Sequence, residues 1–316
     1  MYDDQVNKIV KHFAQIKLGK PIYKFSTTKL GLGENNINYK LNLNNQKYVI
    51  RIGLRKEFES NMKKEFFSLK LLPKDMGSQP IYFDNSKKIV PKVYSILSFI
   101  EGKKVIRWQN KHLKLHAEKL AHLHKKKYPF HGNIYKKFKT NIDLHKRLQR
   151  DMKEFGTTLK NRNIQRILPK VEQYIKDNNH LFQKLKKFSL IHGDPCIDNI
   201  LFTKDKIHYI DWEWTQFYDP AEDVSRFFFP DIACNPWYIK LSKEKINYFL
   251  KHYLKINPDK TLRQRVKVKN TFLKFTDYVY FKWKLDNWKT ETSQLPKSHY
   301  QNIVKVMQNS LEKQFL

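Results

Sequence analysis

The chain has 316 residues, enough for one large domain or for two lobes that each bury a core. Its 40% hydrophobic and 14% aromatic residues argue against disorder, and we find no membrane-spanning apolar run or signal-peptide core, so we expect a folded cytoplasmic protein without a membrane span. The 62 Lys and Arg against 30 Asp and Glu give a net charge of +32, yet these residues are spread along the whole chain without a nucleic-acid-binding motif, so we expect no specific nucleic-acid partner.

Three strands are predicted between residues 22 and 52, where YKFSTTKL, NINYKLNL and QKYVIRI alternate in strand fashion. Asn44-Asn45 predicts a hairpin turn between the second strand and the third. The turn before the second strand has the pattern Gly-x-Gly, ending at Gly33, and is small and flexible enough to bring backbone amides close to phosphate groups. The pattern alone fits a plain hairpin turn equally well.

The next segments predict one helix, further strands and then a mostly helical remainder. A helical pattern at residues 55–72 ends before Pro73, and strands follow at 80–83 and 89–94. The apolar segment 95–102 reads as a strand that ends in a turn. From Gln109 onward helices predominate, and we expect them through residues 130–188 and near 241–255, 260–289 and 297–314.

Asp194, Asn199 and Asp211 belong to one predicted hairpin, residues 190–214, with the sequence LIHGDPCIDNILFTKDKIHYIDWEW. Two β-type stretches flank a short turn, so the three polar side chains are expected at one end of a rigid element. Metal-assisted phosphoryl transfer needs such a set: one carboxylate accepts the proton of the attacking hydroxyl, while an amide oxygen and a second carboxylate hold Mg²⁺ on the triphosphate. Protein kinases have the same Asp-to-Asn spacing after His-Arg, whereas this chain has His-Gly.

HGDPCIDNILF, followed by IDWEWTQFYDPAEDVSRFF, resembles the aminoglycoside phosphotransferase and choline kinase superfamily of small-molecule kinases. The resemblance implies a two-lobed, protein-kinase-like α+β fold. An N-lobe of antiparallel sheet plus one helix would occupy residues 1–100, and a mostly helical C-lobe with the catalytic hairpin and the acceptor site would occupy residues 101–316. It also implies ATP and Mg²⁺ as cofactors, Asp194 as the catalytic base, and Asn199 and Asp211 as metal ligands.

The resemblance assigns phosphate contacts to three residues of the N-lobe. In this superfamily a glycine-containing loop ends in asparagine before a strand, which implies phosphate contacts by Gly33 and Asn36. Arg51 stands where protein kinases have the lysine that contacts the α- and β-phosphates. Choline-kinase-like members also place arginine here, and its charged fork can meet two phosphate oxygens.

The same resemblance suggests a partner for Arg51 and a place for the adenine ring. Glu65, in the helix segment EFFSLKLL, is expected to pair with the arginine, with Glu57 and Glu59 as competitors. The segment that joins the two lobes would read the adenine edge with backbone groups, at Ser98 and Ile100. Backbone readout leaves little signature in the side chains, so these two residues mark only a location.

The acceptor is less clearly indicated than the chemistry. Residues 276–288, TDYVYFKWKLDNW, resemble the aromatic helix that holds a quaternary ammonium in choline kinases, and Tyr280 and Trp283 are spaced i, i+3. The two rings fit helix packing as well. We therefore favour a choline- or ethanolamine-like amino alcohol slightly. Aminoglycosides, homoserine, thiamine and sugars are alternatives, although the basic composition tilts against a polycationic drug.

Two further sets of residues are expected to have no catalytic role. Asp219 and Asp223, in Asp-Pro-Ala-x-Asp, suit the start of a helix, because a capping residue precedes proline and acids favour the helix N-terminus. His116, His122 and His124 tempt a metal-site interpretation, but their spacing does not place all three on one helical face.

The sequence therefore predicts an ATP- and Mg²⁺-dependent kinase that phosphorylates a hydroxyl of a small molecule. A protein kinase is a rival, although no Ala-Pro-Glu segment follows the metal-binding aspartate. A non-catalytic nucleotide-binding pseudokinase and a polyanion-binding protein are rivals from other classes. Cys196 and Cys234 make neither a disulfide framework nor a metal cluster, and the residues indicate no role for Cys196 and no oligomeric state.

Overall fold

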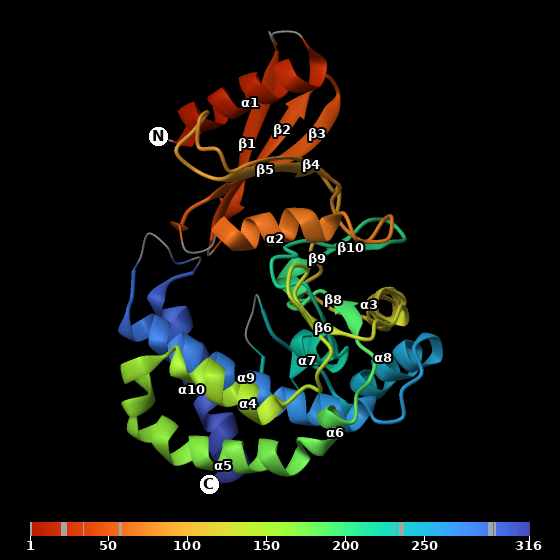
Figure 1. Cartoon of the computed structure of the whole chain (residues 1–316), viewed down its shortest axis with the longest axis vertical. Helices are drawn as coiled ribbons and strands as arrows, with labels where there is room; N and C mark the ends of the chain where they lie inside the picture. The colour runs from red at the N-terminus through yellow and green to blue at the C-terminus, as the bar shows by residue number, and fades with distance from the viewer. Residues whose placement is uncertain are drawn as a thin grey trace. The chain divides into compact units, whose positions relative to one another are not determined.

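The computed structural model describes residues 2–19, 24–33, 35–56, 59–229, 231–233, 237–289, 293 and 295–316. The chain forms two compact units (Figure 1). The first comprises Met1–Gly102, His208–Trp214 and Glu291–Gln294, and the second comprises Lys103–Ile207, Thr215–Thr290 and Leu295–Leu316. An antiparallel sheet dominates the first unit and helices dominate the second, so the predicted α+β fold class is confirmed.

Five antiparallel strands form the sheet of the first unit, in the order β1-β2-β3-β5-β4. Asn44 and Asn45 join the second strand to the third with φ angles of 48° and 60°, which asparagine tolerates better than most residues, so the predicted hairpin turn is present. The elements of this unit are α1 (Tyr2–Leu18), β1 (Phe25–Leu32), β2 (Asn36–Leu43), β3 (Gln46–Gly53), α2 (Glu59–Leu69), β4 (Pro80–Asp84) and β5 (Tyr94–Ser98).

The alternation of side chains along β3 separates the core of this unit from its charged residues. Phe13 of α1 and Ile50 of β3 belong to the same buried apolar cluster on one face of the sheet. Because successive side chains of a strand point to opposite faces, Arg51 lies on the other face, where it contacts Glu65 of α2. The sheet thus buries its apolar face under α1 and presents a cation to α2.

Two elements of the first unit differ from the prediction. The helix expected at residues 55–72 is α2, which covers Glu59–Leu69. The strand expected at residues 89–94 is absent except for Tyr94, which begins β5. Pro91 lacks a backbone donor and therefore disfavours a strand across that segment.

The second unit contains most of the helices and several short strands. A four-stranded sheet has the order β7-β6-β11-β8, and β12 pairs in parallel with β13. The elements are α3 (Asn110–Lys125), β6 (His131–Gly132), β7 (Lys137–Phe138), α4 (Leu144–Lys153), η2 (Gly156–Lys160), α5 (Arg162–Asn178), α6 (His180–Gln183), β8 (Ser189–Ile191), η3 (Ile197–Asn199), β9 (Ile200–Phe202), β11 (Gln216–Tyr218), α7 (Ala221–Phe227), β12 (Phe228–Phe229), β13 (Ile239–Lys240), α8 (Lys243–Ile256), α9 (Leu262–Asp286) and α10 (Lys297–Phe315). The strand β10 (Ile207–Tyr209) follows β9 after a turn closed by the hydrogen bond from Thr203 N–H to Lys206 O.

The helix α9 is the centre of the second unit. It packs against α4, α5, α7 and α10, and its apolar side chains join one large buried cluster (Figure 1). The same helix buries Lys269 and Asp277, which form ion pairs with α7. Among the described residues, no helix is both long and apolar enough to cross a membrane.

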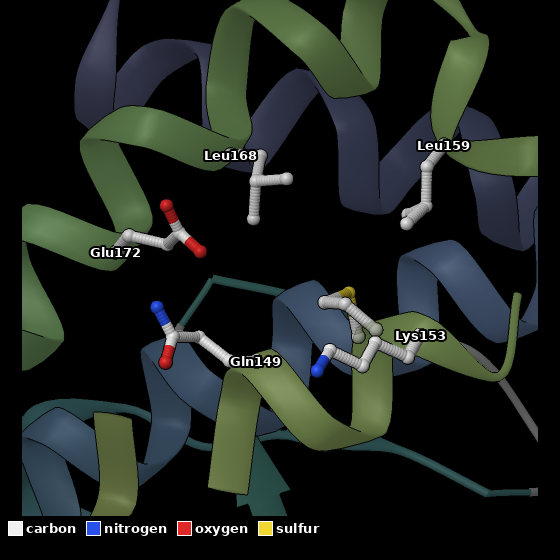
Figure 2. A pocket seen from close by; sticks show the side chains of 6 residues that line it. Gln149, Lys153, Leu159, Leu168 and Glu172 are labelled. Carbon is white, nitrogen blue, oxygen red and sulfur yellow. The ribbon is translucent and has the colours of Figure 1, made fainter. Parts of the chain in front are cut away.

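The sequence predicts helices throughout residues 130–188, but the structure contains short strands in this segment. Residues 131–132 and 137–138 form the two-residue strands β6 and β7, which are too short to leave a strand-like alternation. A hollow of about 380 Å³ lies between α4, η2 and α5 (Figure 2). The hollow is lined by Gln149, Met152, Lys153, Leu159, Leu168 and Glu172. None of these residues belongs to the functional site that the sequence predicts.

Candidate functional site

Arg51 is the centre of a charged cluster in the first unit. Its side chain is 9% exposed, and its Nη1 lies 3.2 Å from Glu65 Oε1 while Nη2 lies 2.9 Å from Asp211 Oδ1. Burial lowers the pKa of Arg51, but the two carboxylates outweigh burial and hold it above its usual range. Arg51 therefore keeps its charge and contacts the glutamate predicted for it. The competitor Glu59 pairs with Lys87 at 2.9 Å, and Glu57 lies outside the described residues.

Asp211 belongs to this cluster because its segment, His208–Trp214, is part of the first unit. Tyr209 N–H donates to Met76 O at 2.9 Å, and Trp212 N–H donates to Glu65 Oε1 at 3.2 Å. Asp211 itself has a left-handed backbone, with φ of 65°, a conformation that costs a non-glycine residue about 1–3 kcal/mol. The flanking hydrogen bonds hold the residue in that conformation.

Gly77 allows this close approach. A Cβ atom at Gly77 would lie 2.7 Å from Trp212 Nε1 and 2.9 Å from Tyr209 O, which is closer than real Cβ contacts. The Trp212 side chain is fully buried and donates from Nε1 to Tyr209 O at 3.0 Å. Only a residue without a side chain fits between these groups.

Glu213 is a third acid beside Arg51, and the sequence analysis did not single it out. Its Oε1 accepts a hydrogen bond from Asn35 Nδ2 at 3.1 Å, while Oε2 has no partner among the described residues. Burial, reinforced by Asp211, raises the pKa of Glu213 to about 8. Burial likewise raises the pKa of Glu65 to about 7, although Arg51 lowers it. Three acids thus surround Arg51, and Lys64 is a further cation near the two glutamates. In the sequence, the one feature that could have pointed to Glu213 is its position two residues after Asp211, in IDWEW.

The predicted phosphate loop closes on itself beside this cluster. Gly33 N–H donates to Asn36 O at 2.8 Å. With its amide oxygen toward the guanidinium, Asn36 accepts a hydrogen bond from Arg51 Nη2 at 3.0 Å, and its amide nitrogen donates to Asn35 O at 3.1 Å. The loop asparagine and the strand arginine are therefore in direct contact.

The segment expected to meet adenine begins at the end of β5. Ser98 N–H donates to Gln79 O at 2.9 Å, and Phe99 N–H donates to Lys47 O at 3.1 Å. Ile100 O accepts from Gly102 N–H at 3.0 Å. These bonds commit the N–H groups of Ser98 and Phe99 to other backbone groups of the first unit.

In the second unit, Asp194 and Asn199 form a pair on the loop after β8. Asn199 Nδ2 donates to Asp194 O at 2.9 Å and to Asp194 Oδ2 at 3.1 Å. Asp194 N–H donates to His192 Nδ1 at 3.2 Å. Because the amide nitrogen of Asn199 faces Asp194, its amide oxygen points away from Asp194. Cys196 is buried, and burial, followed by the nearby Asp194 charge, raises the pKa of its thiol well above its usual range. That protonated thiol is an unreactive neighbour.

Asp223 of α7 holds the backbone of this loop. Its Oδ2 accepts from His192 N–H at 2.8 Å and its Oδ1 accepts from Gly193 N–H at 2.7 Å. His124 Nε2 lies 3.0 Å from Asp223 Oδ2, and His124 Nδ1 lies 2.8 Å from Tyr253 OH. Asp223 thus connects α3, α7 and α8 to the two residues that precede Asp194.

Asp219 and the neighbouring acid of α7 are held by cations of this chain. Asp219 Oδ1 accepts from Ala221 N–H at 3.0 Å, and its carboxylate binds Arg265 at 2.9 Å. Glu222 binds Arg147 at 3.0 Å and also binds Lys269. The N-cap residue of α7 is Pro220, so Asp219, expected to cap the helix, lies one residue before the cap.

The predicted aromatic pair of α9 is present as a pair of neighbouring rings. Tyr280 and Trp283 stack with ring centroids 6.3 Å apart, and Tyr280 is 36% exposed. Trp283 also contacts Phe155, at 6.4 Å between ring centroids. The pair therefore combines packing with partial exposure of Tyr280.

Two of the three histidines of α3 contact other side chains of the second unit. His116 is buried against Phe227, with ring centroids 4.1 Å apart, and His124 is bound to Asp223. Within the described part of the chain, no group of three or more His, Cys, Asp or Glu side chains could hold a metal ion. A metal at the predicted ligands would therefore need oxygen donors beyond these residue types, such as an amide and phosphates.

Comparisons with known proteins identify the family of the chain and the fold that it shares with solved structures. The family model described as "Phosphotransferase enzyme family" matches residues 26–264. A search of the curated proteins gave no match. The chain is similar in fold to choline kinase from Cryptosporidium parvum Iowa II, with 15% identity, a TM-score of 0.65 and coverage of 98% of this chain and 96% of that one. It is similar to Plasmodium vivax ethanolamine kinase, with 17% identity, a TM-score of 0.62 and coverage of 95% and 87%. It is also similar to a spectinomycin phosphotransferase in complex with ADP and spectinomycin, with 16% identity, a TM-score of 0.56 and coverage of 97% and 98%.

Proposed function

Because the chain belongs to the phosphotransferase enzyme family, we propose that it is an ATP- and Mg²⁺-dependent kinase that moves the γ-phosphate to a hydroxyl of a small molecule. The observation that carries this proposal is the pairing of Asp194 with Asn199 at 3.1 Å, on a loop whose backbone is held by Asp223. A carboxylate fixed in this way suits the acceptance of a proton from an alcohol. The use of ATP favours a cytoplasmic location.

Asp194 acts as the base in this proposal. The acceptor oxygen forms a bond to the γ-phosphorus while the bond from that phosphorus to the bridging oxygen of ADP breaks. The hydroxyl proton passes to Asp194, so the products are the phosphorylated acceptor and ADP. Asn199 keeps Asp194 in position through its two hydrogen bonds.

Asn199 and Asp211 are the residues proposed to hold Mg²⁺. The acids around Asp211 fit a cation, because burial raises the pKa of Glu65 and Glu213 and a bound cation would favour their charged forms. Carboxylate and amide oxygens are suitable Mg²⁺ donors, and the buried Glu213 Oε2 has no partner among the described residues. When bound, the ion would neutralise charge on the phosphate oxygens.

The first unit is proposed to bind the nucleotide. Arg51, positioned by Glu65, contacts the phosphates with its charged fork, and Gly33 and Asn36 shape the loop beside them. Ile100 N–H, with the carbonyl of Ser98, reads the adenine edge. The spectinomycin phosphotransferase of similar fold was solved with ADP, which supports nucleotide use.

The acceptor is proposed to be a small amino alcohol such as choline or ethanolamine. The exposed face of Tyr280, stacked with Trp283, suits an ammonium group. Solved structures of similar fold include a choline kinase and an ethanolamine kinase, which fits this choice. An aminoglycoside, homoserine, thiamine or sugar acceptor is the alternative.

ADP release tests the reaction class. The purified chain would be incubated with Mg-ATP and choline, ethanolamine, an aminoglycoside, homoserine, thiamine or a simple sugar. We expect release that depends on one acceptor and disappears in Asp194→Ala, while the affinity for Mg-ATP is retained. Near wild-type turnover in Asp194→Ala would refute the base assignment. Mg-ATP binding with no turnover on any acceptor would favour a pseudokinase.

A further inference from the structure

Asn35, in the loop between β1 and β2, is bonded through both its backbone and its side chain. Its carbonyl oxygen accepts a hydrogen bond from Leu54 N–H, just after β3, at 2.9 Å. Its side-chain Nδ2 donates to Glu213 Oε1 at 3.1 Å, although 178 residues separate the two in sequence. Asn35 therefore joins the loop proposed to meet the phosphates to the segment His208–Trp214, within the first unit.

The loop around Asn35 is closed by its own hydrogen bond. Gly33 N–H donates to Asn36 O at 2.8 Å, so Asn35 lies inside a closed turn of residues 33–36. Asn36, the next residue, contacts Arg51 Nη2 at 3.0 Å through its amide oxygen. A displacement of the Asn35 side chain would therefore move the whole turn, including the residue that contacts Arg51.

The segment at the other end of this bond is the one that carries the proposed metal ligand. Asp211 Oδ1 lies 2.9 Å from Arg51 Nη2, and Trp212 N–H donates to Glu65 Oε1 at 3.2 Å. Residues 211, 212 and 213 thus contact β3, α2 and the turn 33–36 in succession. A change in the position of Asp211 would reach the turn through Glu213.

Asn35 provides the hydrogen bond that holds the Glu213 side chain. Glu213 is buried, and its second oxygen, Oε2, has no partner among the described residues. Without the Asn35 amide, neither side-chain oxygen of this buried acid would have a hydrogen bond from the described part of the chain. Because an unsatisfied buried polar group is costly, Glu213 would leave its present position.

We infer that Asn35 is a positioning residue that couples nucleotide binding to metal binding, because its hydrogen bond to Glu213 holds the turn 33–36 and the segment of Asp211 in one arrangement. The inference rests on the proposed function, since it requires phosphates beside the turn and Mg²⁺ at Asp211. Each ligand orders its own side, and the bond extends that order to the other side, so the second ligand binds a part that is already arranged.

Nucleotide affinity with and without Mg²⁺ tests the inference. The dissociation constant of ATP would be measured by titration calorimetry for the wild type, Asn35→Ala and the control Asn42→Ala. Asn42 is a matched control, because its Nδ2 also bonds a side chain of the first unit, Ser26 Oγ, at 2.9 Å. Mg-ATP forms in solution to the same extent for all three proteins, so its formation cancels in the comparison.

Asn35→Ala should lower the ratio of the dissociation constant without Mg²⁺ to that with Mg²⁺ by about tenfold, within the range usual for coupled sites. The affinity for ATP without Mg²⁺ should stay close to that of the wild type, and Asn42→Ala should keep the full ratio. A merely structural role would weaken both affinities equally. An unchanged ratio in Asn35→Ala would therefore overturn the inference.

A double-mutant cycle tests whether Asn35 acts through Glu213. Glu213→Ala removes the acceptor, so adding Asn35→Ala to this variant should leave the Mg²⁺ ratio unchanged. A further loss as large as in the wild-type background would show that Asn35 acts through another group, and the inference would be wrong.

Hydrogen exchange gives a second readout that does not depend on turnover. The N–H groups of Gly33 and Leu54 report on the turn, because both bond to its carbonyl groups. Adding Mg²⁺ to the ATP complex should slow their exchange in the wild type and slow it much less in Asn35→Ala. Equal slowing in the two proteins would contradict the coupling.

Thermal unfolding would show whether Asn35→Ala folds. If it does not, Asn35→Ser takes its place: its side chain is one atom shorter, so the bond to Glu213 is lost, and the same fall in the Mg²⁺ ratio is expected. A wild type that does not bind Mg-ATP would refute both the proposed function and the inference. Coupling that depends on Asn35 without turnover on any acceptor would refute the kinase alone. Turnover with an unchanged ratio would refute the role of Asn35 alone.

Discussion

Arg51 Nη2 donates a hydrogen bond to Asp211 Oδ1 at 2.9 Å, although 160 residues separate the two in sequence. The contact joins β3 to the segment His208–Trp214 within the first unit. It places the residue proposed for the phosphates against the residue proposed for the metal. Each of these two side chains therefore sets the electrostatic environment of the other.

Asp211→Ala should weaken the binding of Mg-ATP by at least about tenfold, because a proposed metal ligand is lost. The dissociation constant would be measured by titration calorimetry in the presence and absence of Mg²⁺. Asp205→Asn, at an exposed position in the turn before β10, is the control and should bind as the wild type does. Unchanged affinity in Asp211→Ala would rule out the metal role.

Glu65→Gln should reduce kcat/KM for ATP by about tenfold to a hundredfold, because Arg51 loses the charged partner that orients it. We expect little change in the free energy of unfolding, since burial raises the pKa of Glu65 to about 7 and makes its charge costly in the folded protein. The matched control is Glu59→Gln, because Glu59 is in the same helix as Glu65 but pairs with Lys87 instead of Arg51. Equal effects of the two variants on ATP use would contradict a specific role for Glu65.

Gly77→Ala should destabilise the protein by about 1–3 kcal/mol, because the new Cβ atom would lie 2.7 Å from Trp212 Nε1. The displaced segment carries Asp211, so the affinity for Mg-ATP should fall together with stability. Chemical denaturation and nucleotide titration would measure the two effects. Gly31→Ala is the control for stability, since a Cβ atom there would meet nothing within 4 Å. A wild-type affinity in Gly77→Ala would show that the segment does not depend on this close approach.

Glu222→Gln should cost about 3–5 kcal/mol of stability at neutral pH, because it leaves the buried Lys269 without its charged partner and removes one of the two carboxylates that bind Arg147. Burial raises the pKa of Glu222, but these two cations outweigh burial and hold it well below its ordinary value of 4.5. The carboxylate therefore contributes stability above about pH 4.5, and this contribution is lost as the pH falls toward the pKa of the folded protein.

Denaturation curves from pH 7 down to pH 3 would test this pH dependence. The difference in stability between the wild type and Glu222→Gln should shrink toward acid pH. The control Glu154→Gln, at an exposed position, should follow the wild type at every pH. A difference that stays constant with pH would show that the effect of Glu222→Gln does not come from the charge.

The sequence by itself determined the fold class, the β2–β3 turn at Asn44-Asn45 and the family of the chain. These depend on local signals, because strand alternation, turn chemistry and short motifs are carried by residues close together in the chain. The contact between Asp194 and Asn199 is of this kind, since only five residues separate them. Their roles in catalysis and metal binding follow from the resemblance and remain predictions for the assays above.

Other features became visible only in the tertiary structure. The resemblance already favoured Glu65 as the partner of Arg51, but the 3.2 Å contact, and the pairing of Glu59 with Lys87 instead, depend on how α2 faces the sheet. The raised pKa of Glu213 depends on its burial and on Asp211. The pairing of Arg226 with Asp277, 51 residues apart, depends on the contact of α7 with α9. Burial and the distance between charged groups arise from packing of segments far apart in sequence, so local patterns cannot encode them.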